Sequence, residues 1–253
     1  MDLVQDLQKK IFSVSPPTFS ALALEVFRYQ VEHNILYKRF LQALDINPAD
    51  ITTLEKIPFL PVELFKTHKI LTGTMFTDFY FESSGTTDQQ KSKHYISDLA
   101  LYEESIKKCF ELFYGDIKDY CFLALLPSYF ERKNASLIYM CDKLMKWSAH
   151  KNNGFYLNNF YKLTAILKEN IRNNQKTILI GVSFALLDFA EKYNMNLNEI
   201  IIMETGGMKG RRTELTREEL HRELKRSFNT DTIHSEYGMT ELLSQAYSKD
   251  NGK

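Results

Sequence analysis

The stretches KTILIGVS (residues 176–183) and EIIIMETGG (residues 199–207) decide the fold class, because each is a short apolar run that ends in small and polar residues. Both runs are too short and too rich in β-branched residues for a helix, so each is expected to form a buried strand. Three further runs follow this pattern, the last of them weakly: residues 76–83, 119–127 and 232–238. These runs predict a sheet.

Helical stretches lie between the expected strands. Their apolar stripes are Leu137, Cys141 and Leu144; Phe160, Leu163, Leu167 and Ile171; and Leu220, Leu224 and Phe228. A capping box of Thr216 and Glu219 precedes the last stripe. Strands that alternate with helices form right-handed crossovers, so the sheet is expected to be mostly parallel with flanking helices.

The beginning of the chain is helical instead. Residues 18–44 carry Leu22, Val26 and Tyr29 at helical spacing, and Thr18 is the expected N-cap. A proline-punctuated connector follows. We therefore expect a helical N-terminal region with its connector (residues 1–74) and an α/β nucleotide-binding core (residues 75–253), which together form one compact domain.

The composition excludes several classes of function. The 253 residues are 44% hydrophobic, enough for a sizeable core, and 32 basic residues balance 32 acidic ones, so no global field attracts nucleic acid. The first residues, MDLVQDLQKKIF, do not resemble a signal peptide, and no apolar run approaches the length of a membrane span. Three cysteines without a Cys-x-x-Cys pair favour a reducing compartment. A cytoplasmic location is expected.

Polar loops that contain glycine follow three of the expected strands. SSGTTDQQK (83–91) follows the first strand, ETGG (204–207) the fourth, and YGMTE (237–241) the last. Because the carboxyl ends of parallel strands share one sheet edge, we expect these loops to converge on a ligand site.

The loop at 83–91 partly fits a phosphate-binding P-loop. Gly85, Lys91 and Ser92 match that pattern, but Gln90 stands where the second glycine belongs. Without that glycine the backbone cannot easily curl around a phosphate. A looser anion site and an ordinary solvated turn both remain open.

Longer motifs resemble those of the adenylate-forming superfamily, which includes acyl-CoA synthetases. SSGTTDQQKSKH and YGMTE match its phosphate and nucleotide loops. Together with IPFLPVELFK, LPSYFERKNASLIYM and ETGGMKGRRTELTREELH, they are similar to the acyl-protein synthetases of bacterial luciferase operons, with phenylacetate-CoA ligases as more distant relatives. The fold implied is the large N-terminal domain of adenylate-forming enzymes.

The resemblance implies ATP-dependent activation of a carboxylic acid, fatty or aryl, to an acyl-adenylate. It assigns the β- and γ-phosphates to Ser83, Ser84, Gly85, Thr86, Thr87 and Lys91. Thr240 would contact the α-phosphate and Glu241 would bind Mg²⁺. Tyr237, followed by a tight turn at Gly238, would stack on adenine, whose edge would lie against Gly206 and Gly207. Ser183 and Phe184 would line the acyl pocket. Transfer to a thiol follows in such enzymes, and an acyl acceptor or a reductase subunit is the expected partner.

The superfamily's ribose-binding aspartate, its hinge and its small C-terminal domain have no counterpart after SQAYSKDNGK. The chain is therefore expected to be C-terminally truncated, to bind nucleotide weakly and to lack full turnover. Cys109, Cys121 and Cys141 are expected to be inert core thiols.

Two alternatives remain open. GVSFA (181–185) resembles a G-x-S-x-G nucleophile elbow, with His221 or His234 as a base for Ser183, although Ala185 replaces the second glycine. The other alternative is a non-catalytic module that binds a nucleotide or a partner.

Overall fold

The computed structural model describes residues 3–73, 77–84, 90–127, 133–207 and 215–249. The chain folds into two units, Met1–Tyr102 and Glu103–Lys253. The division expected after residue 74 stays a prediction. No helix within the described ranges is both long and apolar enough to cross a membrane.

The N-terminal unit is mainly helical, as the sequence predicted. Its core joins Phe27, Tyr37, Leu41 and Ile51. The expected N-cap was wrong: Ser15 caps the second helix, and Thr18 lies at the third helical position, where it completes a capping box. The helices are α1 (Leu3–Phe12), α2 (Pro16–His33), α3 (Ile35–Ala43) and α4 (Leu64–Thr67), with single 3₁₀ turns at Pro48–Asp50 and Leu54–Lys56.

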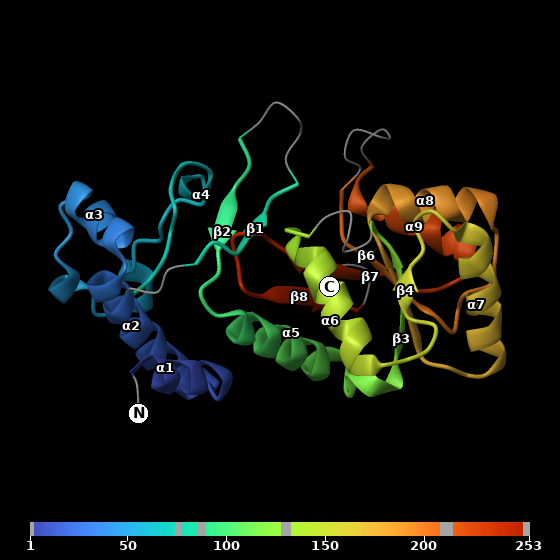
Figure 1. The fold of residues 1–253 in the computed structure, drawn as a ribbon, viewed down its shortest axis with the longest axis horizontal. Helices are drawn as coiled ribbons and strands as arrows, with labels where there is room; N and C mark the ends of the chain where they lie inside the picture. The colour runs from blue at the N-terminus through green and yellow to red at the C-terminus, as the bar shows by residue number, and fades with distance from the viewer. Residues whose placement is uncertain (1–2, 74–76, 85–89, 128–132, 208–214, 250–253) are drawn as a thin grey trace. The chain divides into compact units, whose positions relative to one another are not determined.

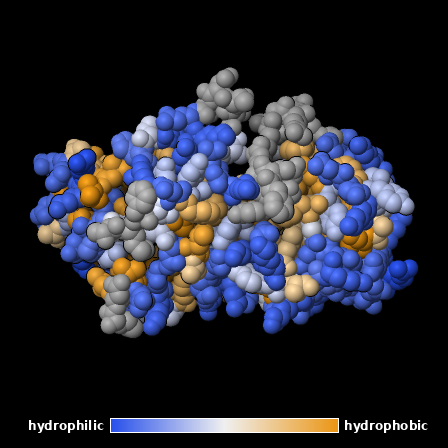
Figure 2. All heavy atoms as spheres, viewed as in Figure 1, coloured by the Kyte–Doolittle hydropathy of each residue, from blue (hydrophilic) through white to orange (hydrophobic). Residues whose placement is uncertain are grey.

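An apolar groove opens on this unit. It has a volume of about 720 Å³ and is lined mainly by aliphatic and aromatic side chains, among them Phe19, Val26 and Phe59. Hydrophobic atoms, drawn in orange, gather over the N-terminal helices in Figure 2. The groove is therefore a surface of the N-terminal helices that the rest of this unit leaves uncovered.

The C-terminal unit is built on a six-stranded sheet in the order β4-β3-β5-β6-β7-β8. The first five strands in that order are parallel and β8 is antiparallel, so the prediction of a mostly parallel sheet is confirmed. Every residue of β3 and β5 is buried, which explains their continuous apolar runs. The strands are β3 (Cys121–Leu125), β4 (Gly154–Phe155), β5 (Thr177–Gly181), β6 (Ile201–Glu204), β7 (His234–Gly238) and β8 (Gln245–Ser248).

The first expected strand does not belong to this sheet. β1 (Tyr80–Glu82) pairs with β2 (Lys93–Tyr95) in a separate antiparallel hairpin of the N-terminal unit. The polar loop at 83–91 is thus a hairpin connection, and it does not follow a strand of the parallel sheet. An apolar run shows that a segment is extended, whereas its pairing partner depends on a short polar strand that the hydrophobic pattern does not show.

Five helices flank the six-stranded sheet within the described residues: α5 (Leu99–Tyr114), α6 (Ser136–Ser148), α7 (Phe160–Arg172), α8 (Ser183–Lys192) and α9 (Arg217–Phe228). α7, α8 and α9 lie together, away from α5 and α6 (Figure 1). The predicted stripes at Leu163, Leu167, Leu220 and Leu224 are buried, and the capping box at Thr216 is present. Ser183, the last residue of the expected strand 176–183, instead begins α8.

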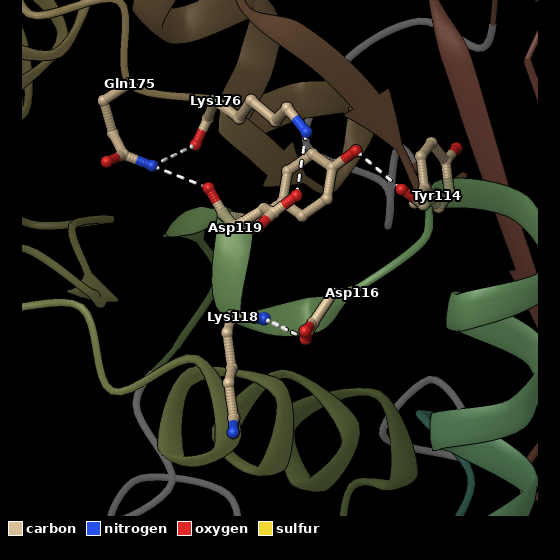
Figure 3. A network of polar contacts seen from close by, with 7 residues as sticks. Tyr114, Asp116, Lys118, Asp119, Gln175 and Lys176 are labelled. Atoms are coloured by element: carbon tan, nitrogen blue, oxygen red, sulfur yellow. Dashed lines mark hydrogen bonds and ion pairs between the residues drawn. The ribbon is translucent and has the colours of Figure 1, made fainter.

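A polar network joins the segments that precede β3 and β5 (Figure 3). Lys176 Nζ pairs with Asp119 Oδ2 at 2.8 Å, and Gln175 Nε2 donates to the Asp119 carbonyl. The Tyr120 hydroxyl donates to the carbonyl of Tyr114. The ion pair is exposed and contributes little by itself, but the network ties together the amino ends of neighbouring strands.

Gly181 → Ala is expected to destabilise the C-terminal unit. A Cβ atom at residue 181 would lie 2.9 Å from Leu125 Cβ and 3.1 Å from Leu186 Cγ, between β5, β3 and α8. Overpacking of this kind costs about 1–3 kcal/mol. Urea unfolding followed by the fluorescence of Trp147, the single tryptophan, measures this loss. An unchanged midpoint would mean that the two strands separate at little cost.

Candidate functional site

Two of the predicted loops meet at the carboxyl edge of the six-stranded sheet. Thr205–Gly207 follows β6, whereas Tyr237–Glu241 begins with the last two residues of β7 and continues into the turn beyond it. β6 and β7 are neighbours, with Glu204 opposite Ser235 in the register. Parallel strands end at one edge, so the register brings these two loops side by side.

The carboxylate of Glu204 anchors the first loop. Glu204 is only 4% exposed and accepts hydrogen bonds from Ser235 Oγ at 2.6 Å and from the Gly206 amide at 2.7 Å. His221 Nε2 lies 3.5 Å from Glu204 Oε1, the oxygen that also accepts from Ser235. Burial by itself would raise the pKa of Glu204, but the hydrogen bonds from His221, Ser235 and Gly206 hold that pKa below its usual value. An ionised carboxylate therefore fixes the loop in place.

Sequence reasoning missed this anchor. The signal was present, because an acidic residue that ends the apolar run of β6 is unusual in a buried strand. His221 was considered only as a base for Ser183, although it shares the buried face of α9 with Leu220 and Leu224.

The glycine loop presents open backbone. Gly206 and Gly207 have φ angles of +70° and +86°, which non-glycine residues rarely adopt. Nothing lies within 4 Å of the position that a Cβ on Gly206 would take. The Ser183 amide donates to the Gly206 carbonyl at 3.3 Å, so the start of α8 supports the loop. A flat ligand can approach such a backbone closely.

The second loop offers a ring, a hydroxyl and a carboxylate. Tyr237 is 58% exposed at the end of β7. Thr240 and Glu241 follow in a turn and are partly exposed. Within the described part of the chain, Glu241 makes no hydrogen bond or ion pair, and no group of three or more potential metal ligands occurs. Glu241 therefore offers a single carboxylate. Such a ligand suits a cation whose other ligands are phosphate and water oxygens.

A second carboxyl group lies beneath this loop. Glu236 is 7% exposed, and its Oε1 atom lies 2.8 Å from where a Cβ on Gly238 would be, so Gly238 makes room for it. Burial, with a smaller contribution from the negative charge of Glu204, raises the pKa of Glu236 to about 8. Glu236 is thus mostly neutral at pH 7, next to an ionised Glu204.

The residues expected to form the phosphate loop lie in the N-terminal unit. The Ser83 hydroxyl accepts from the Ser92 amide at 2.9 Å and closes the hairpin, while Lys91 Nζ pairs with Glu82 at 2.9 Å. Ser84 is exposed. Gly85, Thr86 and Thr87 lie outside the described residues. Convergence of this loop with the two loops of the sheet edge stays a prediction.

The geometry gives no support to a Ser–His pair. Ser183 is 2% exposed in the first turn of α8. His221 faces Glu204, and His234 Nδ1 lies 3.0 Å from the Tyr114 hydroxyl. Both histidines that were considered as a base are therefore engaged elsewhere.

The three cysteines are free thiols. Burial raises the pKa of all three, to about 11 for Cys121, so the thiolate form needed for acyl transfer is disfavoured.

No protein-family model and no curated protein sequence matches the chain. A solved structure does: the open conformation of 2-hydroxyisobutyryl-CoA ligase in complex with 2-HIB-AMP and CoA. The TM-score is 0.56 at 10% identity, over 87% of this chain and 49% of the ligase. The chain thus has the α/β fold of an adenylate-forming ligase domain, and it spans about half the length of that protein. At this identity the similarity shows the fold alone.

Proposed function

We propose that this protein activates a carboxylic acid with ATP, giving an acyl-adenylate and pyrophosphate. One observation carries the proposal: Glu204 fixes the open glycine loop directly beside the loop Tyr237–Glu241, at the carboxyl edge of the sheet. The fold shared with a ligase that was solved with 2-HIB-AMP and CoA supports chemistry of this class.

Each group at this edge has a role in holding ATP. The Tyr237 ring stacks on adenine, and Gly206 and Gly207 let the base lie against backbone. Gly238 ends β7 and leaves room for Glu236, and the turn that follows carries the Thr240 hydroxyl to the α-phosphate. The carboxylate of Glu241 holds Mg²⁺, which neutralises charge on the phosphates.

The remaining phosphate contacts are assigned to the hairpin loop. Ser83, Ser84, Gly85, Thr86 and Thr87 hold the β- and γ-phosphates with Lys91. In this arrangement Lys91 exchanges its ion pair with Glu82 for phosphate. That pair is 44% and 29% exposed, so its loss costs little.

The reaction requires no side-chain nucleophile. The substrate carboxylate attacks the α-phosphorus, an oxygen–phosphorus bond forms, and pyrophosphate leaves with the electron pair of the broken bond. Negative charge accumulates on the α-phosphate oxygens, where a preorganised donor such as Thr240 offsets it. Mg²⁺ held by Glu241 would add positive charge there.

The acid and the acceptor belong to the proposal as well. A fatty or aryl acid is the proposed substrate, with Ser183 and Phe184 near its acyl part. The proposed later step is transfer to a thiol acceptor, with a reductase subunit as partner in a cytoplasmic setting, as in the acyl-protein synthetases that the motifs resemble.

Binding of ATP tests the proposal without requiring turnover. Calorimetric titration of this chain with ATP and Mg²⁺ should give measurable affinity, and Tyr237 → Ser should weaken it about tenfold through lost stacking. Leu242 → Ser, a change at an exposed residue in the same loop, should leave the affinity unchanged. If ATP does not bind, or Tyr237 has no effect, the proposal fails. Labelling of Ser183 by a fluorophosphonate would favour a serine hydrolase instead.

A further inference from the structure

A second ligand-sized pocket begins at the carboxyl edge of the sheet and extends along α8 to Lys192 and Tyr193. It has a volume of about 790 Å³. Its walls include Pro127 after β3, Asn158 and Asn159 after β4, and Phe184 in the first turn of α8. Neither the glycine loop nor the Tyr237 loop contributes to it.

The position of this pocket in the topology is typical of a binding site. β3 connects through α6 to β4 on one side, whereas β5 lies on the other side of β3 and continues through α8 to β6. The order of the strands therefore reverses at β3, and α6 lies on a different face from α7 and α8 (Figure 1). Open parallel sheets bind ligands in the crevice at this reversal.

A second hollow of about 510 Å³ lies next to this pocket. The two hollows share Lys192 and Tyr193 at the end of α8. Along α7, Tyr161 lines the first hollow, and Lys168 and Arg172 line the second. These three residues lie on one face of α7, since they are spaced by seven and four residues.

The second hollow is basic. Lys168, Arg172 and Lys192 are exposed, and none of them pairs with a carboxylate of the described residues. Arg172 and Lys192 lie in the last turns of their helices, where the helix dipole favours a cation. That preference does not explain Lys168, which lies one turn earlier. The chain as a whole is neutral, so this cluster is a local feature.

The first hollow suits a planar polar ring. Tyr161 is 81% exposed, although an aromatic side chain normally buries its ring. Asn158, Asn159 and Asp188 also line this hollow; Asn159 Oδ1 accepts from the Lys162 amide as the N-cap of α7, which leaves its NH₂ group as the donor. Amides can read the edge of a base, and a carboxylate can accept hydrogen bonds from ribose hydroxyls.

We propose that the two hollows together bind a nucleoside diphosphate, at a site separate from the loops assigned to ATP above. The base stacks on Tyr161, and the phosphates lie among Lys168, Arg172 and Lys192. From Tyr161 to Lys168 the helix rises about 10 Å, comparable to the length of an extended nucleoside diphosphate. This proposal stands on the pocket alone and does not depend on adenylate formation.

Photolabelling with 8-azido-ADP separates the two sites, because it identifies the peptide that receives the label. The expected result is labelling of the peptide that contains Tyr161. Lys168 → Glu combined with Arg172 → Glu should reduce that labelling about tenfold, because charge-assisted contacts to phosphate are lost. Arg222 → Glu, the same charge change at an exposed position on α9, should not. Labelling at Tyr161 should also be unaffected by Glu241 → Gln. Trp147 fluorescence checks that each variant is folded.

Competition experiments identify the part of the ligand that binds. ADP and inorganic pyrophosphate should compete with the label at Tyr161, and adenosine should compete weakly. Label confined to the peptide around Tyr237, or undiminished in the double variant, would overturn the proposal. The proposal would also be overturned if polyglutamate competed more strongly than ADP and Tyr161 → Ser had no effect on labelling. That result would indicate that the site binds an acidic polypeptide.

Discussion

Glu241 → Gln is expected to lower ATP–pyrophosphate exchange roughly a hundredfold or more in a form of the protein that turns over, because Mg²⁺ bound to phosphate would need a hard anionic ligand from the protein. The amide keeps the shape of the side chain and removes its charge. Within the described residues Glu241 makes no bond that the substitution would break, so the fold should be unaffected.

A second measurement on the same variant requires no turnover. Calorimetry should show that Mg²⁺ strengthens ATP binding to the unmodified chain and has little effect on Glu241 → Gln. Glu241 → Asp keeps the charge and should retain part of the metal dependence. Equal Mg²⁺ dependence in the unmodified chain and the glutamine variant would remove Glu241 from the metal site.

Glu236 → Gln is expected to stabilise the protein increasingly as the pH rises from 5 to 8. Burial raises the pKa of Glu236 to about 8 from a model-peptide value of 4.5. The native state therefore holds a proton that the unfolded state releases. This proton contributes its full stabilisation to the native state below pH 4.5, and the contribution is lost as the pH rises towards 8. Glutamine does not titrate, so it avoids this loss, which is about 4 kcal/mol at pH 8.

The neighbouring groups do not obscure this window. Glu204 is already ionised, because its pKa lies below the usual value, and the pKa values of Cys109, Cys141 and Tyr247 are raised. Urea midpoints at several pH values, read by Trp147 fluorescence, measure the difference between the two proteins. Glu199 → Gln, at an exposed site, is the control. A difference between Glu236 → Gln and the unmodified protein that does not change with pH would show that Glu236 is ionised in the native state.

The sequence identified β3, β5 and β6 correctly because each is mostly buried and therefore appears as a short apolar run. It indicated β7 only weakly, since this strand is polar and its last two residues are exposed. β4, with two residues, and the more polar β8 carry no such pattern, and the sequence did not predict them. The capping box of α9 was readable for a different reason, since Thr216 and Glu219 form it within one turn.

The residues of the candidate site were only partly predictable. The positive φ angles of Gly206 and Gly207 agree with what the ETGG motif suggested, since few other residues adopt that conformation. The hydrogen bonds of Glu204 to Ser235 and His221 join residues 31 and 17 positions apart, and no local pattern signals such contacts.

The sequence by itself determined the fold class and the loops that carry polar chemistry, because hydrophobic periodicity and short motifs are local properties of the chain. Only the tertiary structure decided which loops meet. It placed β1 in a hairpin and formed a pocket where the order of strands reverses at β3. It also brought His221 next to Glu204, and not next to Ser183. The physical reason is that strand order and long-range hydrogen bonds depend on how the whole chain packs, and not on the residues within any one segment.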